Sequence, residues 1–241
     1  MRFSYRNAQQ LFCLRACLKN HSRNQHAPLC GIFHPNSVAV ARYGAIIRAK
    51  YPTNCDAHLA ESLFQTHSRT DLWQRTYYHF RNDNAPVLQI ETEEKFFSFM
   101  VKTDFKESHH RFDQCGVVMY LDSENWLKGS IEYENDNFQH LGSVVTNNGY
   151  SDWATTEIDA EIKSMWYRLS RREDDYCIEC SEDGIRFKQM RICHMWAGAG
   201  KIKFGIYACS PEDSSFKAVF TDMKLTECQW KAHDGQKPDE M

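Results

Sequence analysis

The chain has 241 residues, of which 42% are hydrophobic, enough to fill the core of one large domain or two small ones, and this excludes gross disorder. A mean hydropathy of -0.63, with no uncharged apolar run near the roughly 18 to 20 residues that cross a bilayer, excludes a transmembrane helix. The formal net charge of -3 is uneven: residues 1–55 hold eight of the 29 basic side chains and none of the 32 acidic ones, and the acidic remainder argues against nucleic acid as a ligand.

The basic segment over residues 1–55 is predicted to be separate from the folded body. It is rich in Arg, Ser, Asn and His, and Leu11, Leu14 and Leu18 can form one stripe of a helix. This composition is typical of a mitochondrial transit peptide. A disordered leader or a wrongly assigned start of translation has the same traits. We therefore interpret 1–55 as a disordered or targeting segment.

Beyond residue 60, short runs of aromatic and β-branched residues alternate with turn-like clusters of Asn, Asp and Gly. The predicted strands cover 62–67, 73–81, 87–91, 96–104, 113–121, 126–133, 138–146, 164–171, 175–181, 186–193, 202–209 and 216–226. About a dozen strands with no long amphipathic helix predict an all-β fold, a two-sheet antiparallel sandwich or jelly roll. One domain over 56–230, followed by a polar C-terminal tail over 231–241, is the simplest architecture.

The strand over 126–133 distinguishes the two faces of its sheet, because alternate side chains point to opposite faces. The set expected to face the core is Leu127, Gly129, Ile131 and Tyr133. The set on the other face is Trp126, Lys128, Ser130 and Glu132. A polar face that carries a Trp is either ordinary solvated sheet or a platform on which a sugar ring stacks while polar groups bind its hydroxyls.

The sequence contains only weak signs of catalysis. Glu132, Glu134 and Asp136 alternate and could share one strand face, and a glycoside hydrolase needs two carboxylates roughly 5 to 9.5 Å apart. Asp136 lies in a turn-like cluster, however, and no nearby residue would raise the pKa of one carboxyl for acid catalysis. A nucleophile elbow, a Gly-rich phosphate loop and a helix-borne His motif are absent from the sequence. We assign no catalytic residue and expect neither a cofactor nor a metal.

The ten cysteines are widely spaced and do not form the pattern of a disulfide scaffold. Cys177 and Cys180 have the two-residue gap of a metal or redox pair, but residues three apart on a strand face opposite sides of the sheet. Free thiols indicate a reducing compartment. We expect a cytoplasmic location, or a mitochondrial one if 1–55 is a transit peptide.

An ordered series of phrases between about residue 63 and residue 225 carries a family resemblance. They include Thr70-Asp71-Leu72-Trp73-Gln74-Arg75-Thr76, Asp113-Gln114-Cys115-Gly116, Asp122-Ser123-Glu124-Asn125-Trp126-Leu127-Lys128, Ile131-Glu132-Tyr133, Tyr150-Ser151-Asp152-Trp153 and Trp166-Tyr167-Arg168-Leu169. In this order they resemble the regulation-of-enolase protein family, a concanavalin A-like domain of unknown function. The resemblance implies a jelly-roll sandwich of the lectin and glucanase type. It also implies a small buried thiol at Cys115, where the family usually has Ala.

The resemblance further implies a ligand-binding cluster on the concave sheet. Its members are Trp73, Arg75, Gln114, Trp126, Lys128, Glu132, Asp152 and Trp153. The Trp rings would stack on sugar faces, and the polar side chains would bind hydroxyls or a carboxylate. In the alternative interpretation the same residues only join adjacent strands, with Arg75 and Lys128 neutralising the acidic members.

These features favour a non-catalytic module that binds a carbohydrate or a sugar-bearing metabolite, because related sandwich modules accompany glycoside hydrolases. Two alternatives stay open. One is a regulatory interaction protein that acts on a metabolic enzyme such as enolase. The other is a glycoside hydrolase that uses Glu132 and Glu134.

Overall fold

A computed structural model of the chain describes residues 40–41, 47–50 and 61–231. Within these ranges the chain contains strands and no helix, which confirms the predicted all-β class. The remaining parts of the predicted leader over 1–55, and the tail from residue 232 onward, lie outside the described residues. No helix in the described part is long and apolar enough to cross a membrane.

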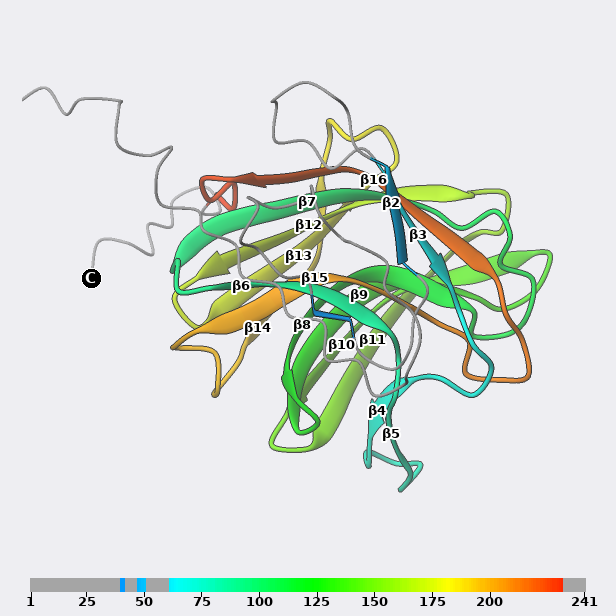
Figure 1. Ribbon diagram of the computed structural model, residues 1–241, viewed down its shortest axis with the longest axis horizontal. Coiled ribbons are helices and arrows are strands. Elements are labelled where there is room, and N and C mark those ends of the chain that lie inside the picture. Colours follow the sequence, from blue (N-terminus) through cyan, green and yellow to red (C-terminus); the bar gives the residue numbers. More distant parts are fainter. Residues whose placement is uncertain (1–39, 42–46, 51–60, 232–241) are drawn as a thin grey trace, which may run out of the picture.

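Two seven-stranded sheets lie one on the other as the layers of an antiparallel sandwich (Figure 1). The first sheet has the order β1 (Val40–Ala41), β6 (Val87–Thr92), β15 (Ile202–Cys209), β8 (Gln114–Asp122), β9 (Asn125–Tyr133), β10 (Phe138–Asn147) and β11 (Tyr150–Asp159). The second sheet has the order β14 (Lys188–His194), β13 (Asp175–Ser181), β12 (Ser164–Arg172), β7 (Phe96–Asp104), β16 (Lys217–Thr226), β3 (Glu61–Gln65) and β2 (Ile47–Lys50). Two short strands of the predicted leader, β1 and β2, thus pair at sheet edges.

The main hydrophobic core fills the space between the two sheets. Leu127 and Ile131 of β9 lie in this core and are fully buried, as their alternation predicts. Phe204 of β15 contacts Phe97 and Phe99 of the opposite sheet, with ring centroids 4.5 and 5.3 Å apart. Cys115 is also fully buried, and all six described cysteines are free thiols.

A second, smaller core lies on the outer face of the first sheet. The chain between β3 and β6 folds over this face, and Leu72 and Trp73 pack there against Trp126, Val144 and other outward-facing side chains. Trp126 is fully buried as a result. The covering segment contains a third, two-stranded sheet, formed by β4 (Leu72–Gln74) and β5 (Arg81–Asp83), which projects at one end of the sandwich (Figure 1).

Beyond residue 60, the structure corrects the strand predictions in two places. The run 73–81 was expected to be one strand, but it folds into the β4–β5 hairpin, in which Trp73 pairs with Asn82. The edge strand β11 was missed altogether. Most of its side chains are exposed, so β11 lacks the apolar alternation that identifies a half-buried strand.

Candidate functional site

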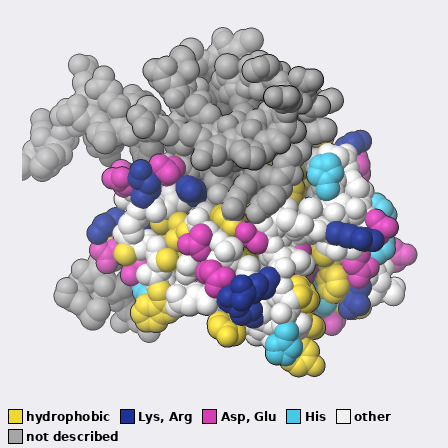
Figure 2. All heavy atoms as spheres, turned by 60° about the horizontal axis from the view of Figure 1, so that its bottom comes forward, with side chains coloured by type: hydrophobic (Ala, Val, Ile, Leu, Met, Phe, Trp, Pro, Cys, Tyr) yellow, Lys and Arg dark blue, Asp and Glu magenta, His cyan; other side chains and the backbone are white. Residues whose placement is uncertain are grey.

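A cavity of about 390 Å³ opens beside the hairpin on the outer face of the first sheet. Five of the eight predicted site residues line it: Trp73, Gln114, Lys128, Glu132 and Trp153. The other lining residues include Asp71, Tyr78 and Phe80 of the covering segment, and Arg111, Phe112 and Glu212 from two loops. Figure 2 shows the molecule from the end where the hairpin projects, with hydrophobic, basic and acidic side chains mixed on this surface rather than one charge dominating it.

The hairpin loop that forms one side of the cavity has an unusual backbone. Arg75, Tyr77 and His79 all have positive φ angles, between 56° and 62°, which side chains other than Gly seldom adopt. Backbone hydrogen bonds from Arg75 N to Phe80 O (2.9 Å) and from His79 N to Arg75 O (2.6 Å) hold the loop in this shape. The loop thereby returns Tyr78 and Phe80 toward Trp73.

The cavity has an aromatic wall centred on Trp73. The ring centroid of Trp73 lies 5.6 Å from that of Tyr78, 6.4 Å from that of Phe80 and 6.3 Å from that of Trp153. Trp73 is 9% exposed, whereas Trp153 is 38% exposed. A buried ring flanked by partly exposed rings offers the apolar surface on which the face of a sugar ring packs.

The floor of the cavity is a buried polar network. Lys128 Nζ donates a hydrogen bond to Gln114 Oε1 (2.8 Å), and the Tyr207 hydroxyl donates to the same oxygen (2.9 Å). Lys128 Nζ also lies 3.5 Å from Asp71 Oδ1. Burial by itself lowers the pKa of Lys128, but the Asp71 carboxylate and other negative groups outweigh it, so the net shift of the pKa is upward and the amine stays charged.

Glu132 adds a carboxyl group to this floor. Its side chain is 5% exposed and lines the cavity, yet no described residue donates a hydrogen bond to it or forms an ion pair with it. Burial raises the pKa of Glu132 to about 7, although the nearby Lys128 opposes the shift. The indole N–H of Trp73 is likewise buried without an acceptor among the described residues. Such groups cost free energy unless a ligand or water satisfies them.

The other three predicted site residues are held elsewhere. Trp126 is buried under the hairpin in the second core. Arg75 bonds to both carboxylate oxygens of Glu124 (2.7 and 3.2 Å) and to the carbonyl oxygen of Gly149 (2.6 Å). Asp152 on β11 accepts a hydrogen bond from Arg191 of β14 (2.5 Å). Arg75 and Asp152 thus pair with Glu124 and Arg191, and not with other members of the predicted cluster as the alternative interpretation expected.

Sequence reasoning missed several lining residues. Tyr78 and Phe80 were hidden because 73–81 was taken as one strand instead of a hairpin. Asp71 lies two residues before Trp73 in the same family phrase. This spacing could have indicated that Asp71 also lies at the site. Arg111 lies in a loop, and no pattern in the sequence indicated its position.

The carboxylates considered for glycoside hydrolysis do not form a pair in this cavity. Glu134 Oε1 binds Arg111 Nε at 2.8 Å, and Glu134 is not among the lining residues. Asp136 accepts a hydrogen bond from the Tyr133 hydroxyl (2.6 Å) in the following turn. Only Glu132 of the three faces the cavity, which does not favour the hydrolase alternative.

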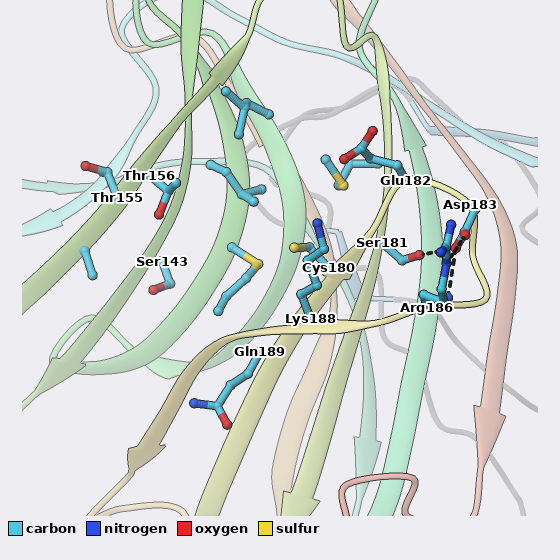
Figure 3. A pocket seen from close by; sticks show the side chains of 15 residues that line it. Ser143, Thr155, Thr156, Cys180, Ser181, Glu182, Asp183, Arg186, Lys188 and Gln189 are labelled. Carbon is cyan, nitrogen blue, oxygen red and sulfur yellow. Dashed lines mark hydrogen bonds and ion pairs between the residues drawn. The ribbon is translucent and has the colours of Figure 1, made fainter.

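A larger cavity, of about 700 Å³, opens between the sheet edges near β11 and β14. In Figure 3, Ser143, Thr155 and Thr156 lie on one side of it and Arg186, with Asp183 and Ser181, on the other. Asp183 already binds Ser181 Oγ (2.9 Å), Arg186 Nε (3.1 Å) and loop N–H groups. Because the Asp183 carboxylate is 39% exposed and already satisfied by protein donors, this cavity is the weaker candidate for a polar ligand.

The described residues include one group that could surround a metal ion, Asp174, Asp175 and His194, with ligand atoms within 4.8 Å of one another. His194 Nδ1 lies 2.8 Å from Asp175 Oδ1, so the cluster is accounted for as a partly exposed ion pair at a turn. We assign no metal to it.

Residues 50–228 match the family model described as a protein of unknown function (DUF1349), and residues 18–76 match a second family of unknown function (DUF6783). The chain is 31% identical over 171 residues to "Regulation of enolase protein 1" of Saccharomyces cerevisiae, covering 70% of this chain and 84% of the relative.

Solved structures agree on the fold. A functionally unknown protein from Saccharomyces cerevisiae superimposes with a TM-score of 0.64 at 27% identity, over 76% of this chain and 96% of that one. The GH43 protein BlXynB from Bacillus licheniformis gives a TM-score of 0.54 at 18% identity, over 69% of this chain and 33% of that one. The xylan beta-1,4-xylosidase of Bacillus halodurans gives a TM-score of 0.55 at 10% identity, over 68% and 33% respectively. At these low identities the last two show the sandwich fold alone.

Proposed function

Since the chain belongs to the DUF1349 family of proteins of unknown function, we propose that its sandwich is a non-catalytic module that binds a carbohydrate or a sugar-bearing metabolite. The ligand occupies the cavity lined by Trp73, Lys128 and Glu132. This is the predicted cluster without Arg75, Trp126 and Asp152.

One observation carries the proposal: an aromatic wall and a buried polar floor meet in one cavity, and each holds a polar group that has no hydrogen-bond partner among the described residues. The acceptor is the Glu132 carboxyl group on the floor, and the donor is the Trp73 indole N–H in the wall. A sugar hydroxyl both donates and accepts hydrogen bonds, so adjacent hydroxyls can satisfy both groups, while the ring carbons pack on the aromatic wall. The cavity of about 390 Å³ lies within the range of roughly 300 to 1,000 Å³ that small-molecule sites occupy.

A titration with mono- and disaccharides, followed by Trp fluorescence, tests the proposal. We expect a saturable change for at least one sugar class, with roughly tenfold weaker binding in Trp153→Ala, since stacking on one aromatic ring contributes about 0.5 to 1.5 kcal/mol beyond its buried area. Trp196→Ala is the matched control, because Trp196 is 71% exposed and does not line the cavity. Absence of a saturable response for every sugar class would contradict carbohydrate binding.

A second candidate is regulation of a metabolic enzyme by direct contact, which we propose because the yeast relative is named for regulation of enolase. The hairpin tip supports this candidate, since Tyr77 is 82% exposed and Tyr78 is 52% exposed, with their ring centroids 5.0 Å apart. Exposed aromatic side chains are enriched in protein interfaces.

Calorimetry with purified enolase tests this second candidate. We expect binding by the wild type and a loss of at least tenfold in affinity for Tyr77→Ala, but not for the control Ile185→Ala, which removes an equally exposed side chain (81%) from a different loop. No heat of binding for the wild type, or equal losses in both variants, would rule the hairpin tip out as the enolase contact.

A further inference from the structure

The charges that surround Glu132 come from four elements. Lys128 lies on the same strand, and His140 is its register partner on β10. Asp71 approaches from the covering segment. Glu134 follows β9 and pairs with Arg111 of the loop before β8. Gln114, the register partner on β8, is neutral.

The cations among these groups are already compensated. Lys128 Nζ lies 3.5 Å from Asp71 Oδ1, and Arg111 Nε lies 2.8 Å from Glu134 Oε1. At the rim, Glu212 Oε2 lies 3.3 Å from His110 Nδ1. Glu132 is the remaining charged group on the floor, and no cation pairs with it among the described residues. When it is ionised, Glu132 therefore adds a second buried negative charge, beside that of Asp71, to a floor where both carboxylates act on the single amine of Lys128.

We propose that the ligand of this cavity carries an ammonium group, as an amino sugar does, and that this group pairs with Glu132 while the sugar ring packs against Trp73 and Trp153. The inference rests on the proposed carbohydrate binding and narrows its ligand class.

An ammonium group satisfies Glu132 better than a hydroxyl does. A hydroxyl donates one neutral hydrogen bond, whereas an ammonium donates a charge-assisted bond that is roughly twice as strong and also balances the buried charge. The neighbouring rings favour a cation as well, because their faces attract positive charge. A carboxylate-bearing sugar would instead face three acidic lining residues, Asp71, Glu132 and Glu212. The pKa of Glu132, raised to about 7 by burial, is consistent with a carboxylate that lacks its cation.

Four pyranoses that share one ring and differ in one group test the inference: glucosamine, glucose, N-acetylglucosamine and glucuronate. Each is titrated at pH 7 into the full chain, with Trp fluorescence as the readout. We expect glucosamine to bind about tenfold more tightly than glucose, N-acetylglucosamine to lose this preference because its nitrogen is uncharged, and glucuronate to bind most weakly.

Two variants test whether the preference for glucosamine depends on Glu132. Glu132→Gln should bind glucosamine and glucose equally, because the amide keeps the shape but not the charge. Glu107→Gln is the matched control and should keep the preference, since the Glu107 carboxylate is 50% exposed, faces Lys217 at 4.0 Å and does not line the cavity. Circular dichroism verifies folding, and if Glu132→Gln does not fold, the four-ligand series on the wild type decides alone.

Failure of the inference differs from failure of the proposed function. Equal affinity for glucose and glucosamine would overturn the ammonium requirement and leave carbohydrate binding standing. A preference for glucosamine that survives in Glu132→Gln would overturn the role of Glu132. No binding of any sugar would overturn both.

Discussion

Glu132 couples the candidate site to the stability of the fold. Its carboxyl group titrates at about 7 in the folded chain, against an ordinary value of 4.5, because it is buried without a hydrogen-bond donor from the described residues. Between these two pH values the folded chain holds a proton that the unfolded chain has released. Stability therefore falls as the pH rises from 4.5 toward 7 and stays at the lower level above pH 7.

Replacement of this carboxyl group should change the stability of the fold only at high pH. We expect Glu132→Gln to be more stable than the wild type by up to about 3 kcal/mol at pH 8, the equivalent of the pKa shift, and by little at pH 4.5. Urea unfolding at the two pH values, with Glu212→Gln as the control for an exposed carboxylate, measures the difference. A gain that is the same at both pH values would contradict a shifted pKa.

At the scale of elements, the hairpin is fastened to two other turns. Arg75 of the hairpin loop bonds Glu124 of the β8–β9 turn and the carbonyl of Gly149 in the β10–β11 turn, and this bond lowers the pKa of Glu124. Gly149 has a φ of 77°, and a Cβ atom there would lie 1.7 Å from Arg75 Nη1. Gly149 thus leaves room for the contact that positions the aromatic wall.

Gly149→Ala should release this fastening. We expect a loss of stability of more than about 1 kcal/mol from the positive φ alone, with weaker sugar binding because Tyr78 and Phe80 lose their anchor. Thermal unfolding and the fluorescence titration measure the two effects. Gly200→Ala is the matched control, since a Cβ there meets nothing within 4 Å. Equal behaviour of the two variants would show that the Arg75 contact does not position the hairpin.

The strands that could be predicted are those with one face in the core. The run 126–133 shows regular alternation and forms β9 (Asn125–Tyr133). The strand β11 has no such signal because it is an exposed edge. For the site, alternation placed Lys128 and Glu132 on one face, as observed. It could not show that Trp126 on that face is buried, because the hairpin that covers Trp126 comes from a distant part of the chain.

At the scale of the whole molecule, the first sheet is buried on both faces near the site. Phe204 lies in the core between the sheets, whereas Trp126 lies in the second core under the hairpin. The two cores share the strands β8, β9 and β15, so we expect them to unfold together.

Truncations in the two cores test this cooperativity. We expect Phe204→Ala and Trp126→Ala each to lower the free energy of unfolding by about 3 to 5 kcal/mol, the usual cost of removing a large buried ring. Each variant should still unfold in a single transition, followed by Trp fluorescence and by circular dichroism. Separate transitions for the two probes in Trp126→Ala would show that the hairpin core unfolds independently of the sandwich.

Binding in the hairpin cavity can be observed at the indole groups themselves. In a ¹⁵N-correlated NMR titration with glucosamine, we expect the indole N–H resonances of Trp73 and Trp153 to shift to saturation, because both rings line the cavity. Those of Trp166 and Trp196, which do not line it, should stay in place. Unmoved Trp73 and Trp153 signals across glucosamine, glucose and N-acetylglucosamine, or equal shifts of all four signals, would contradict a sugar site at this cavity.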